Sequence, residues 1–356
     1  MKLAAIICEF NPLHTGHKKL IDYAKTLAEN VVCIMSGNFT QRGMPACADK
    51  YQRAKHALLA GADLVVELPT VFATASAENF AFGGVRIADK LNADCLVFGS
   101  ECGDIEQLNY CVDVLDDETI NAKIREEIEK GVSYPKAVAM ATGLKELDQP
   151  NNVLAIEYVR AIRKLHSDIT PITLKRDNNY NDNNAKEFAS SMALRNDPAL
   201  RERYTFDFVA ADVDDNVEQR YCTVAPTFLA VASKEQLEQL EGVTEGIHNR
   251  IFNADKSQGF EGLIEQIKTK RYTRLKLQRI VLNCVLEITK ETAEQAKKAI
   301  EQSQNSPIKL KILGVKKGKE TLLENLENET DELTAKADRL YYTLSGKVPP
   351  TKLIKV

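Results

Sequence analysis

The fold is decided by the stretch Ile6–Lys18, which reads IICEFNPLHTGHK. An apolar strand runs into a turn that contains a proline and then opens a helix, as in the first βα unit of a parallel sheet. A helix N-terminus at the carboxyl end of such a strand presents unpaired N–H groups and the positive end of the helix dipole. This arrangement suits a phosphate group, so we expect a phosphate-binding site at the turn.

Two histidines, His14 and His17, stand three residues apart in this turn, with Gly16 between them. On a helical turn both rings can point to one side and donate hydrogen bonds to phosphate oxygens. Gly16 allows a nucleotide to approach the backbone because it has no Cβ. The alternative is that both histidines are surface residues or a helix cap. We favour a catalytic role for His14 and His17, because the pair follows the first strand in a chain with five histidines.

The pattern of the first strand continues along the chain. Up to about residue 180, short β-rich apolar runs alternate with amphipathic helical stretches, which predicts an α/β fold with a Rossmann-like parallel sheet. The expected strands are Leu3–Glu9, Asn30–Met35, Asp63–Leu68, Asp94–Phe98 and Ile169–Lys175, and the helices expected between them include Lys18–Ala28, Lys50–Ala60 and Phe82–Leu91.

The alternation stops near residue 200, and the remainder is mainly helical in pattern. With 356 residues the chain is longer than one typical domain. We therefore predict two domains, a nucleotide-binding domain over residues 1–200 and a second, mainly helical domain over residues 201–356. The expected elements of the second domain include the helices Lys234–Leu240, Phe260–Thr269, Thr273–Thr289 and Thr292–Ser303 and one strand, Ile308–Leu313. The asparagine-rich segment Asp177–Asn184 is expected to be a surface loop.

Composition excludes several classes of protein. No apolar run approaches the roughly 20 residues of a membrane-spanning helix, so we expect no membrane association. The eight cysteines form no C-x-x-C pair, which argues against structural zinc and favours a reducing, cytoplasmic location. The net charge of -4 gives no general attraction to nucleic acid, so any RNA contact must come from a local basic surface. We find no carboxylate cluster that predicts a dedicated metal site, and the oligomeric state stays open.

Small and polar residues follow the other predicted strands and open later helices. Because parallel strands end at one edge of a sheet, these residues are candidates for the rest of a nucleotide site. They are Gly99 after the fourth strand, Asn151 and Asn152 at a predicted helix start, Arg176 after the fifth strand, and Ser190 and Ser191 before Arg195 in a further helix. As ordinary turns, caps or solvated helix ends, they would need no further explanation.

A basic run near residue 270 is the candidate RNA contact. It contains Lys268, Lys270, Arg271, Arg274, Lys276 and Arg279 without an intervening acid, and Tyr272 lies within it. Such a run can bind phosphates, with an affinity that falls steeply as salt rises. The alternative is a solvated helix face.

Together these segments resemble one family within the nucleotidyltransferase superfamily that carries the HIGH-type signature, namely the bacterial tRNA(Met) cytidine acetate ligases. The resemblance spans the first domain and continues more weakly beyond it, through Glu245–Arg250 and Thr269–Tyr272. The strongest matches are EFNPLHTGH (Glu9–His17), SGNFTQRGMPA (Ser36–Ala46), DLVVELP (Asp63–Pro69), FGSE (Phe98–Glu101), PNNVLAIEY (Pro150–Tyr158), LKR (Leu174–Arg176) and FASSMALR (Phe188–Arg195). Leu13, Thr15 and Met192 depart from the family pattern, which puts loop packing in doubt more than the chemistry.

The resemblance implies a ligase that converts acetate and ATP, with Mg²⁺, to acetyl-adenylate and pyrophosphate. The acetyl group then passes to the exocyclic amine of the wobble cytidine of elongator tRNA(Met). It also implies that Ser190, Ser191 and Arg195 act as a second phosphate motif, and that Gly99, Asn151 or Asn152, and Arg176 complete the nucleotide site. Independently of the resemblance, the basic run makes Lys268, Lys270, Arg271 and Arg274 candidate tRNA contacts. The implied ATP-binding loop consists of Ile7, Cys8, Glu9, Phe10, Asn11, Pro12, Leu13, His14, Thr15, Gly16, His17, Lys18, Lys19 and Leu20.

Two other functions stay open at the level of sequence. A small-molecule nucleotidyltransferase of cofactor biosynthesis would account for the first domain and leave the second without a role. A non-catalytic tRNA-binding protein would keep a degenerate nucleotide fold, but the intact His14, Gly16 and His17 argue against it.

Overall fold

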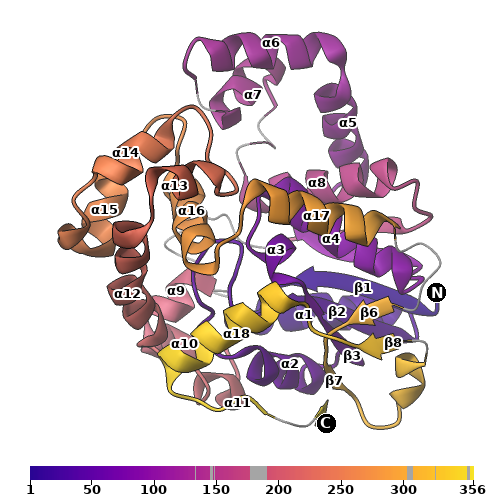
Figure 1. Ribbon diagram of the computed structural model, residues 1–356. Coiled ribbons are helices and arrows are strands. Elements are labelled where there is room, and N and C mark those ends of the chain that lie inside the picture. The colour runs from indigo at the N-terminus through magenta and orange to yellow at the C-terminus, as the bar shows by residue number, and fades with distance from the viewer. Residues whose placement is uncertain are drawn as a thin grey trace.

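The computed structural model contains a seven-stranded mixed sheet in the order β5-β4-β1-β2-β3-β7-β9 (Figure 1). The first five strands in chain order are parallel: β1 (Leu3–Cys8), β2 (Asn30–Ser36), β3 (Leu64–Leu68), β4 (Cys95–Ser100) and β5 (Thr170–Lys175). The prediction of five parallel strands is confirmed, with ends that differ by one or two residues. The structure describes residues 1–132, 134–144, 147, 149–176, 191–302, 308–324, 326–350 and 353–356.

The strand β1 lies at the topological switch point of the sheet. From β1 the chain goes to β2 and β3 on one side and later to β4 and β5 on the other. Ala4, Ala5 and Ile6 are fully buried because β1 pairs on both edges and is covered on both faces. In open α/β sheets ligands bind outside the carboxyl ends of the strands at such a point.

Helices cover both faces of the sheet. One face packs against α1 (Thr15–Leu27) and α2 (Lys50–Leu59), whose buried side chains share a core with Ile6, Cys33 and Val65. The other face packs against α4 (Ala77–Lys90), α5 (Ile105–Asp116) and α8 (Pro150–Lys164). The short α3 (Thr70–Ala73) precedes α4, and α6 (Glu118–Glu129) and α7 (Tyr134–Thr142) project from the sheet at the top of Figure 1.

The part of the chain after residue 190 is mainly helical, as predicted. Its helices are α9 (Ser191–Asn196), α10 (Pro198–Tyr204), α11 (Asp207–Ala210), α12 (Val217–Val231), α13 (Lys234–Gln239), α14 (Ile247–Asn253), α15 (Gly259–Ile267), α16 (Arg274–Leu286), α17 (Lys290–Gln302) and α18 (Glu332–Ser345). The predicted loop Asp177–Asn184 lies outside the described residues.

The prediction of a single strand over Ile308–Leu313 is wrong, because the segment divides at Lys311. Before it, β6 (Ile308–Leu310) pairs with β8 (Leu326–Asn328) in a separate sheet. After it, β7 (Ile312–Val315) pairs antiparallel with β3, and β9 (Ile354–Lys355) pairs with β7. The β3–β7 register shifts between Val65 and Val66, and just beyond this shift the carbonyl of Lys311 accepts the N–H of Glu67 at 2.8 Å. The C-terminal segment therefore extends the sheet of the first half.

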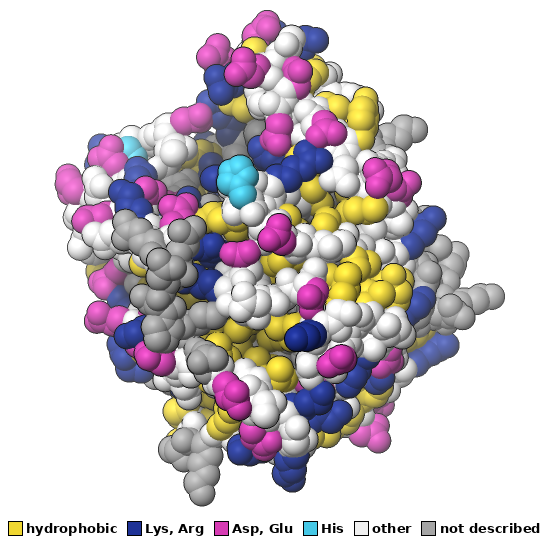
Figure 2. Space-filling view, turned by 90° about the vertical axis from the view of Figure 1, so that its right-hand side faces the viewer, with side chains coloured by type: hydrophobic (Ala, Val, Ile, Leu, Met, Phe, Trp, Pro, Cys, Tyr) yellow, Lys and Arg dark blue, Asp and Glu magenta, His cyan; other side chains and the backbone are white. Residues whose placement is uncertain are grey.

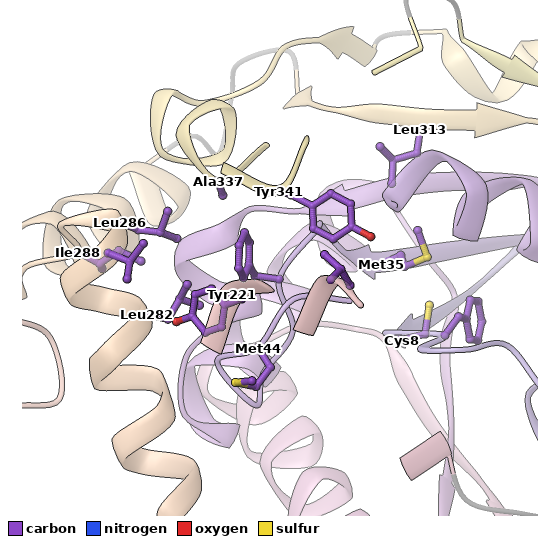
Figure 3. Packing of buried hydrophobic residues seen from close by; sticks show 14 of the residues in the cluster. Cys8, Met35, Met44, Tyr221, Leu282, Leu286, Ile288, Leu313, Ala337 and Tyr341 are labelled. Carbon is purple, nitrogen blue, oxygen red and sulfur yellow. The ribbon is translucent and has the colours of Figure 1, made fainter. Parts of the chain in front are cut away.

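The two halves of the chain also share one hydrophobic core (Figure 3). Met35 from β2 and Met44 from the loop after it belong to the same cluster as Tyr221 from α12, Leu282 from α16 and Tyr341 from α18. Tyr341 donates its hydroxyl proton to the carbonyl of Ala46 at 3.0 Å. The division at residue 200 stays a prediction, and the packing ties the sheet to the helical part.

The surface carries both signs of charge. On the face in Figure 2, Lys and Arg side chains are interspersed with Asp and Glu, with apolar areas between them. All eight cysteines are free thiols. Within the described residues, no helix is long and apolar enough to cross a membrane.

Candidate nucleotide-binding site

His14 is the N-cap of α1. Its Nδ1 accepts the N–H of Gly16 at 3.1 Å, and Nδ1 of His17 accepts the N–H of His14 at 3.3 Å, so the two histidines form a reciprocal capping box. The helix begins at Thr15 rather than at the predicted Lys18 because this pair satisfies N–H groups that usually need a Ser, Thr, Asp or Asn cap. The structure therefore confirms that the two histidines form a helix cap. This role does not exclude phosphate binding by the same side chains.

The two imidazole rings stack at 3.7 Å between centroids with an interplanar angle of 23°. Burial, helped by the positive charge of Arg176, lowers the pKa of His14 to about 3 and that of His17 well below its usual value. Both rings are therefore neutral at physiological pH. Since each Nδ1 accepts an N–H, the proton of each neutral ring belongs on Nε2. The pair thus offers two Nε2–H donors and no positive charge of its own.

The loop before α1 holds a strained backbone and an unused hydroxyl. Phe10 has a φ of +46°, in the left-handed region that residues other than glycine rarely adopt, and its ring lies 5.0 Å from that of His17. The Oγ1 of Thr15 is buried without a hydrogen-bond partner among the described residues. Strain and unsatisfied polar atoms are typical of ligand sites, and a phosphate oxygen would satisfy the Thr15 hydroxyl.

Gly99 and Arg176 lie beside the histidines because β4 is the neighbour of β1. A Cβ on Gly99 would stand 3.2 Å from Cγ of Arg176, so the arginine side chain lies over the glycine. The N–H of Arg176 donates to the carbonyl of Ser100 at 2.9 Å, which fixes the arginine at the end of β5. Its effect on the pKa values of His14 and His17 places its charge near both rings. The structure therefore brings these four predicted residues together.

Asn151 and Asn152 form hydrogen bonds with the turn that follows β4. The Oδ1 of Asn152 accepts the N–H groups of Glu101 at 2.9 Å and Cys102 at 3.2 Å. In return the Glu101 carboxylate accepts the N–H of Asn152 at 2.7 Å and the side-chain amide of Asn151 at 2.6 Å. This reciprocal set fixes the turn beside Gly99 to the N-terminus of α8. Direct contact of either asparagine with ATP stays a prediction.

The second predicted phosphate motif reaches the same loop through α9. The guanidinium of Arg195 donates to the carbonyl of Asn11 at 2.7 Å, and Nη1 of Arg42 contacts Sδ of Met192 at 3.8 Å. Ser191 is the first residue of α9 and is partly buried. Ser190 lies outside the described residues.

The other residues of the predicted ATP loop have mixed environments. Ile7, Cys8, Leu13 and Pro12 are buried, and the Cys8 thiol donates to the carbonyl of Ile34 at 3.8 Å. Lys18 pairs with Asp22 at 2.5 Å, whereas Lys19 is exposed and Leu20 is partly buried on α1. The side chains of Ile7, Cys8 and Leu13 are core residues, so contact with a nucleotide would have to come from their backbone or their neighbours.

Arg53 and Glu9 are site residues whose environment the sequence does not reveal. Arg53 on α2 is fully buried and donates to four backbone carbonyls, those of Glu9, Ser36, Gly37 and Ala48. It thereby ties together the loops that follow β1 and β2. Oε1 of Glu9 accepts the N–H of Gln41 from the second loop at 2.7 Å. For Arg53, the only signal in the sequence is a charged residue at a position of the predicted helix Lys50–Ala60 where an apolar residue is expected.

The predicted basic run does not form one helical stripe, because α16 begins only at Arg274. Lys268 pairs with Glu265 at 3.5 Å, Arg271 with Glu245 at 2.7 Å and Arg274 with Glu261 at 2.5 Å. Lys270 is exposed and has no charged partner within the described part of the chain. Tyr272 is buried, with its hydroxyl bonded to Thr244, so it is a core residue.

Comparison with known proteins gives matches over most of the chain. The model of the HIGH Nucleotidyl Transferase family matches residues 1–341. A tRNA(Met) cytidine acetate ligase of Caldanaerobacter subterraneus is 36% identical, with 93% of this chain and 87% of that protein covered. One of Acetivibrio thermocellus is also 36% identical, with 90% and 85% covered.

A solved structure matches the whole fold. Thermotoga maritima TmcAL bound with alpha-thio ATP superposes with a TM-score of 0.80 at 27% identity, covering 98% of this chain and 96% of that one. The extent of these matches shows the family and not only the fold. This chain therefore belongs to the HIGH nucleotidyl transferases and, within them, to the tRNA(Met) cytidine acetate ligase family.

Proposed function

We propose that this chain joins acetate and ATP to acetyl-adenylate, with release of pyrophosphate, and transfers the acetyl group to the exocyclic amine of the wobble cytidine of elongator tRNA(Met). The observation that carries the proposal is the stacked, neutral pair of His14 and His17 at the N-terminus of α1. Membership of a family whose curated relatives carry this name supports it.

In this proposal ATP lies across the switch point between β4 and β1. Gly99 and Arg176 border the nucleoside side, and the triphosphate lies at the start of α1, beside the two Nε2–H groups and the Thr15 hydroxyl. When acetate attacks the α-phosphorus, negative charge grows on the phosphate oxygens. Two fixed Nε2–H donors and the helix terminus stabilise that charge without having to reorganise, which is the usual source of such rate enhancement.

Mg²⁺ is proposed to enter with ATP. Within the described residues, no group of three or more His, Cys, Asp or Glu side chains is arranged to hold a metal ion. Mg²⁺ commonly keeps several waters and binds through substrate phosphates with one or two carboxylates. We therefore assign the ion to the triphosphate rather than to a protein cage.

The proposed RNA partner approaches the helical half of the chain. Lys268 and Lys270 are exposed near the start of α16, and Arg271 and Arg274 are partly exposed but paired with glutamates. We rank Lys270 first among the four candidate tRNA contacts, because a phosphate need not displace a carboxylate there. A tRNA substrate and eight free thiols fit a cytoplasmic location. Neither a cofactor-precursor nucleotidyltransferase nor a non-catalytic tRNA-binding protein is favoured by the relatives.

The acceptor is tested with two transcripts of elongator tRNA(Met), one unchanged and one with uridine in place of the wobble cytidine. Each is incubated with the protein, ATP, Mg²⁺ and labelled acetate, and the RNA is digested to nucleosides. We expect label in acetylated cytidine from the first transcript only. Equal labelling of both transcripts would place the acetyl group elsewhere, and no labelling of either, with adenylate formed, would exclude this tRNA as the acceptor.

A further inference from the structure

Acetyl transfer to the cytidine amine needs a proton acceptor. A cytidine exocyclic amine that attacks an acyl carbon must lose a proton. Neither His14 nor His17 is suited to take it, because each Nδ1 already accepts a backbone N–H and each Nε2 carries a proton. If the protein itself supplies the base, it is therefore another group, and the carboxyl end of β1 is where the reaction is proposed to take place.

The sheet order divides this region into two sides. The β4 side holds Gly99 and Arg176, where the nucleoside is proposed to lie. The β2 side is bordered by the loop 36–46, which packs against α16, the helix that begins at the candidate tRNA contact Arg274: a Cβ on Gly43 would stand 2.6 Å from the backbone nitrogen of Arg279. An acceptor base that comes from the helical half therefore reaches the acyl group from the β2 side.

Glu9 is placed at this junction. It is the first residue after β1 and lies five positions before His14. One carboxylate oxygen, Oε1, is held by the N–H of Gln41 from the β2 loop at 2.7 Å. The other oxygen, Oε2, has no hydrogen bond within the described part of the chain. One oxygen is thus fixed and the other is available.

Three arginines lie near the Glu9 carboxylate, but none of the described residues forms an ion pair with it. The titratable groups that face it are Cys8 on β1, Arg42 in the β2 loop, Arg53 on α2, Tyr158 on α8 and Arg195 on α9. Arg53 is committed to backbone carbonyls and Arg195 to the carbonyl of Asn11. No ion pair joins any of the three arginines to Glu9 among the described residues, and burial raises the pKa of the carboxyl group despite their charges.

Two further observations mark this spot as a ligand site. The backbone of Phe10, the residue after Glu9, is strained at a φ of +46°. The Nε2 of Gln41, whose backbone binds Glu9, is buried without a hydrogen-bond partner in the described residues. A carboxylate that served only to neutralise arginines would be expected in direct ion pairs with them.

We propose that Glu9 is the general base of the acetyl-transfer step, an assignment that rests on the proposed function. As the amine nitrogen bonds to the acyl carbon, the bond from that carbon to the phosphate oxygen breaks and AMP leaves. The amine proton passes to Oε2 of Glu9, which releases it to solvent after the product departs. The adenylation step, in which acetate attacks already deprotonated, does not need this base.

The test separates the two steps in the full-length protein. Glu9→Gln keeps an oxygen for the N–H of Gln41 and removes the base. We expect single-turnover transfer to tRNA to fall about 10²- to 10⁴-fold, and to fall far more than acetate-dependent pyrophosphate exchange does in the same variant. Wild-type transfer should slow as the pH falls and Glu9 becomes protonated, and the variant should lose this dependence. Glu67→Gln, which removes another buried carboxylate, is the control and should leave the ratio of transfer to exchange unchanged.

Two outcomes would overturn the assignment: equal loss of exchange and transfer in Glu9→Gln, or near wild-type transfer in that variant. If the glutamine variant fails to fold, Glu9→Asp, which keeps a carboxylate, is compared with wild type, and it should retain transfer that slows as the pH falls; transfer in Glu9→Asp that does not slow would also overturn the assignment. Failure of the proposed function is distinct, because the wild-type protein itself would show no acetate-dependent exchange.

Discussion

At the scale of single residues, His14 and His17 form the cap of α1, and the proposed function gives the same two side chains a catalytic role. Their Nδ1 atoms cap α1, and this fixes their Nε2–H donors toward the site. A neutral donor pair stabilises charge that appears on phosphate only in the transition state, without first attracting anions to the free protein. Capping and catalysis are therefore not alternatives for these residues.

Replacing either histidine by asparagine should separate these duties. Asparagine is a favoured N-cap, so α1 should persist in His14→Asn, whereas the Nε2–H donor is lost. We expect acetyl-adenylate formation to fall about 10²- to 10³-fold in His14→Asn and in His17→Asn, with tRNA binding retained. The matched control is His166→Asn, at an exposed histidine with a φ of +50°, which should change neither property. Parallel loss of adenylation and tRNA binding would indicate misfolding instead.

The same pair should make stability depend on pH. Because the pKa of His14 in the folded protein is about 3, below the roughly 6.5 of an unfolded chain, the unfolded state binds more protons between these values. The stabilisation is complete above about pH 6.5 and is lost as the pH falls toward 3, by up to about 1.4 kcal/mol per pH unit for one histidine. Urea unfolding at pH 7, 6 and 5 should therefore show a shallower decline for His14→Asn than for wild type. Equal slopes would contradict a neutral, buried His14.

At the scale of elements, the loop 36–46 depends on the absence of a side chain at Gly43. Gly43 has a φ of +72° and faces the backbone of Gln278 and Arg279 on α16. Gly318 also has a positive φ, +83°, but a Cβ there would meet no atom within 4 Å. Both glycines therefore have a left-handed backbone, but only Gly43 lacks room for a side chain.

Alanine at each position should measure this contact. Gly318→Ala should cost about 1 kcal/mol for the left-handed backbone alone. Gly43→Ala should cost about 1–3 kcal/mol more, because the added methyl group overlaps α16. Denaturant unfolding of both variants gives the difference, and equal losses would show that the loop moves away from α16 without penalty.

Local pattern predicts elements well and their long-range partners poorly. The five parallel strands follow from runs such as Asn30–Met35, because apolar β-branched runs bounded by turns are read locally. The division at Lys311 and the antiparallel pairing of β7 depend on β3, about 250 residues away, so periodicity cannot reveal them. His14, Gly99 and Arg176 were predictable as strand-end residues, whereas the engagement of Asn152 by Glu101 and of Glu9 by Gln41 was not.

At the scale of the whole molecule, a buried ionic cluster ties the C-terminal helix to the sheet. The Nζ of Lys50 lies 2.6 Å from a carboxylate oxygen of Glu67 on β3 and 2.6 Å from one of Asp338 on α18. The Lys50 side chain is fully buried. Burial raises the pKa of Glu67 to about 7, although Lys50 opposes this shift. The buried charge of Glu67 is therefore stable only while Lys50 is present to pair with it.

Removing the cation should be costly. Lys50→Met leaves two carboxyl groups facing each other, one of them buried, and should lower the free energy of unfolding by about 3–5 kcal/mol. Adding Glu67→Gln should recover part of this loss, since it removes the buried charge that was left without a partner. Denaturant unfolding of the single and double variants measures both effects, and a loss below about 1 kcal/mol for Lys50→Met would show that α18 is held by apolar packing alone.

Adenylation of acetate is the step on which the whole proposed function depends. The most direct measurement is exchange of labelled pyrophosphate into ATP by the purified protein, with and without acetate, before any tRNA is added. We predict exchange that requires acetate and that His14→Asn reduces at least about 100-fold. Exchange that is independent of acetate, or absent with and without tRNA, would contradict the ligase function and leave the chain with a nucleotide site of another purpose.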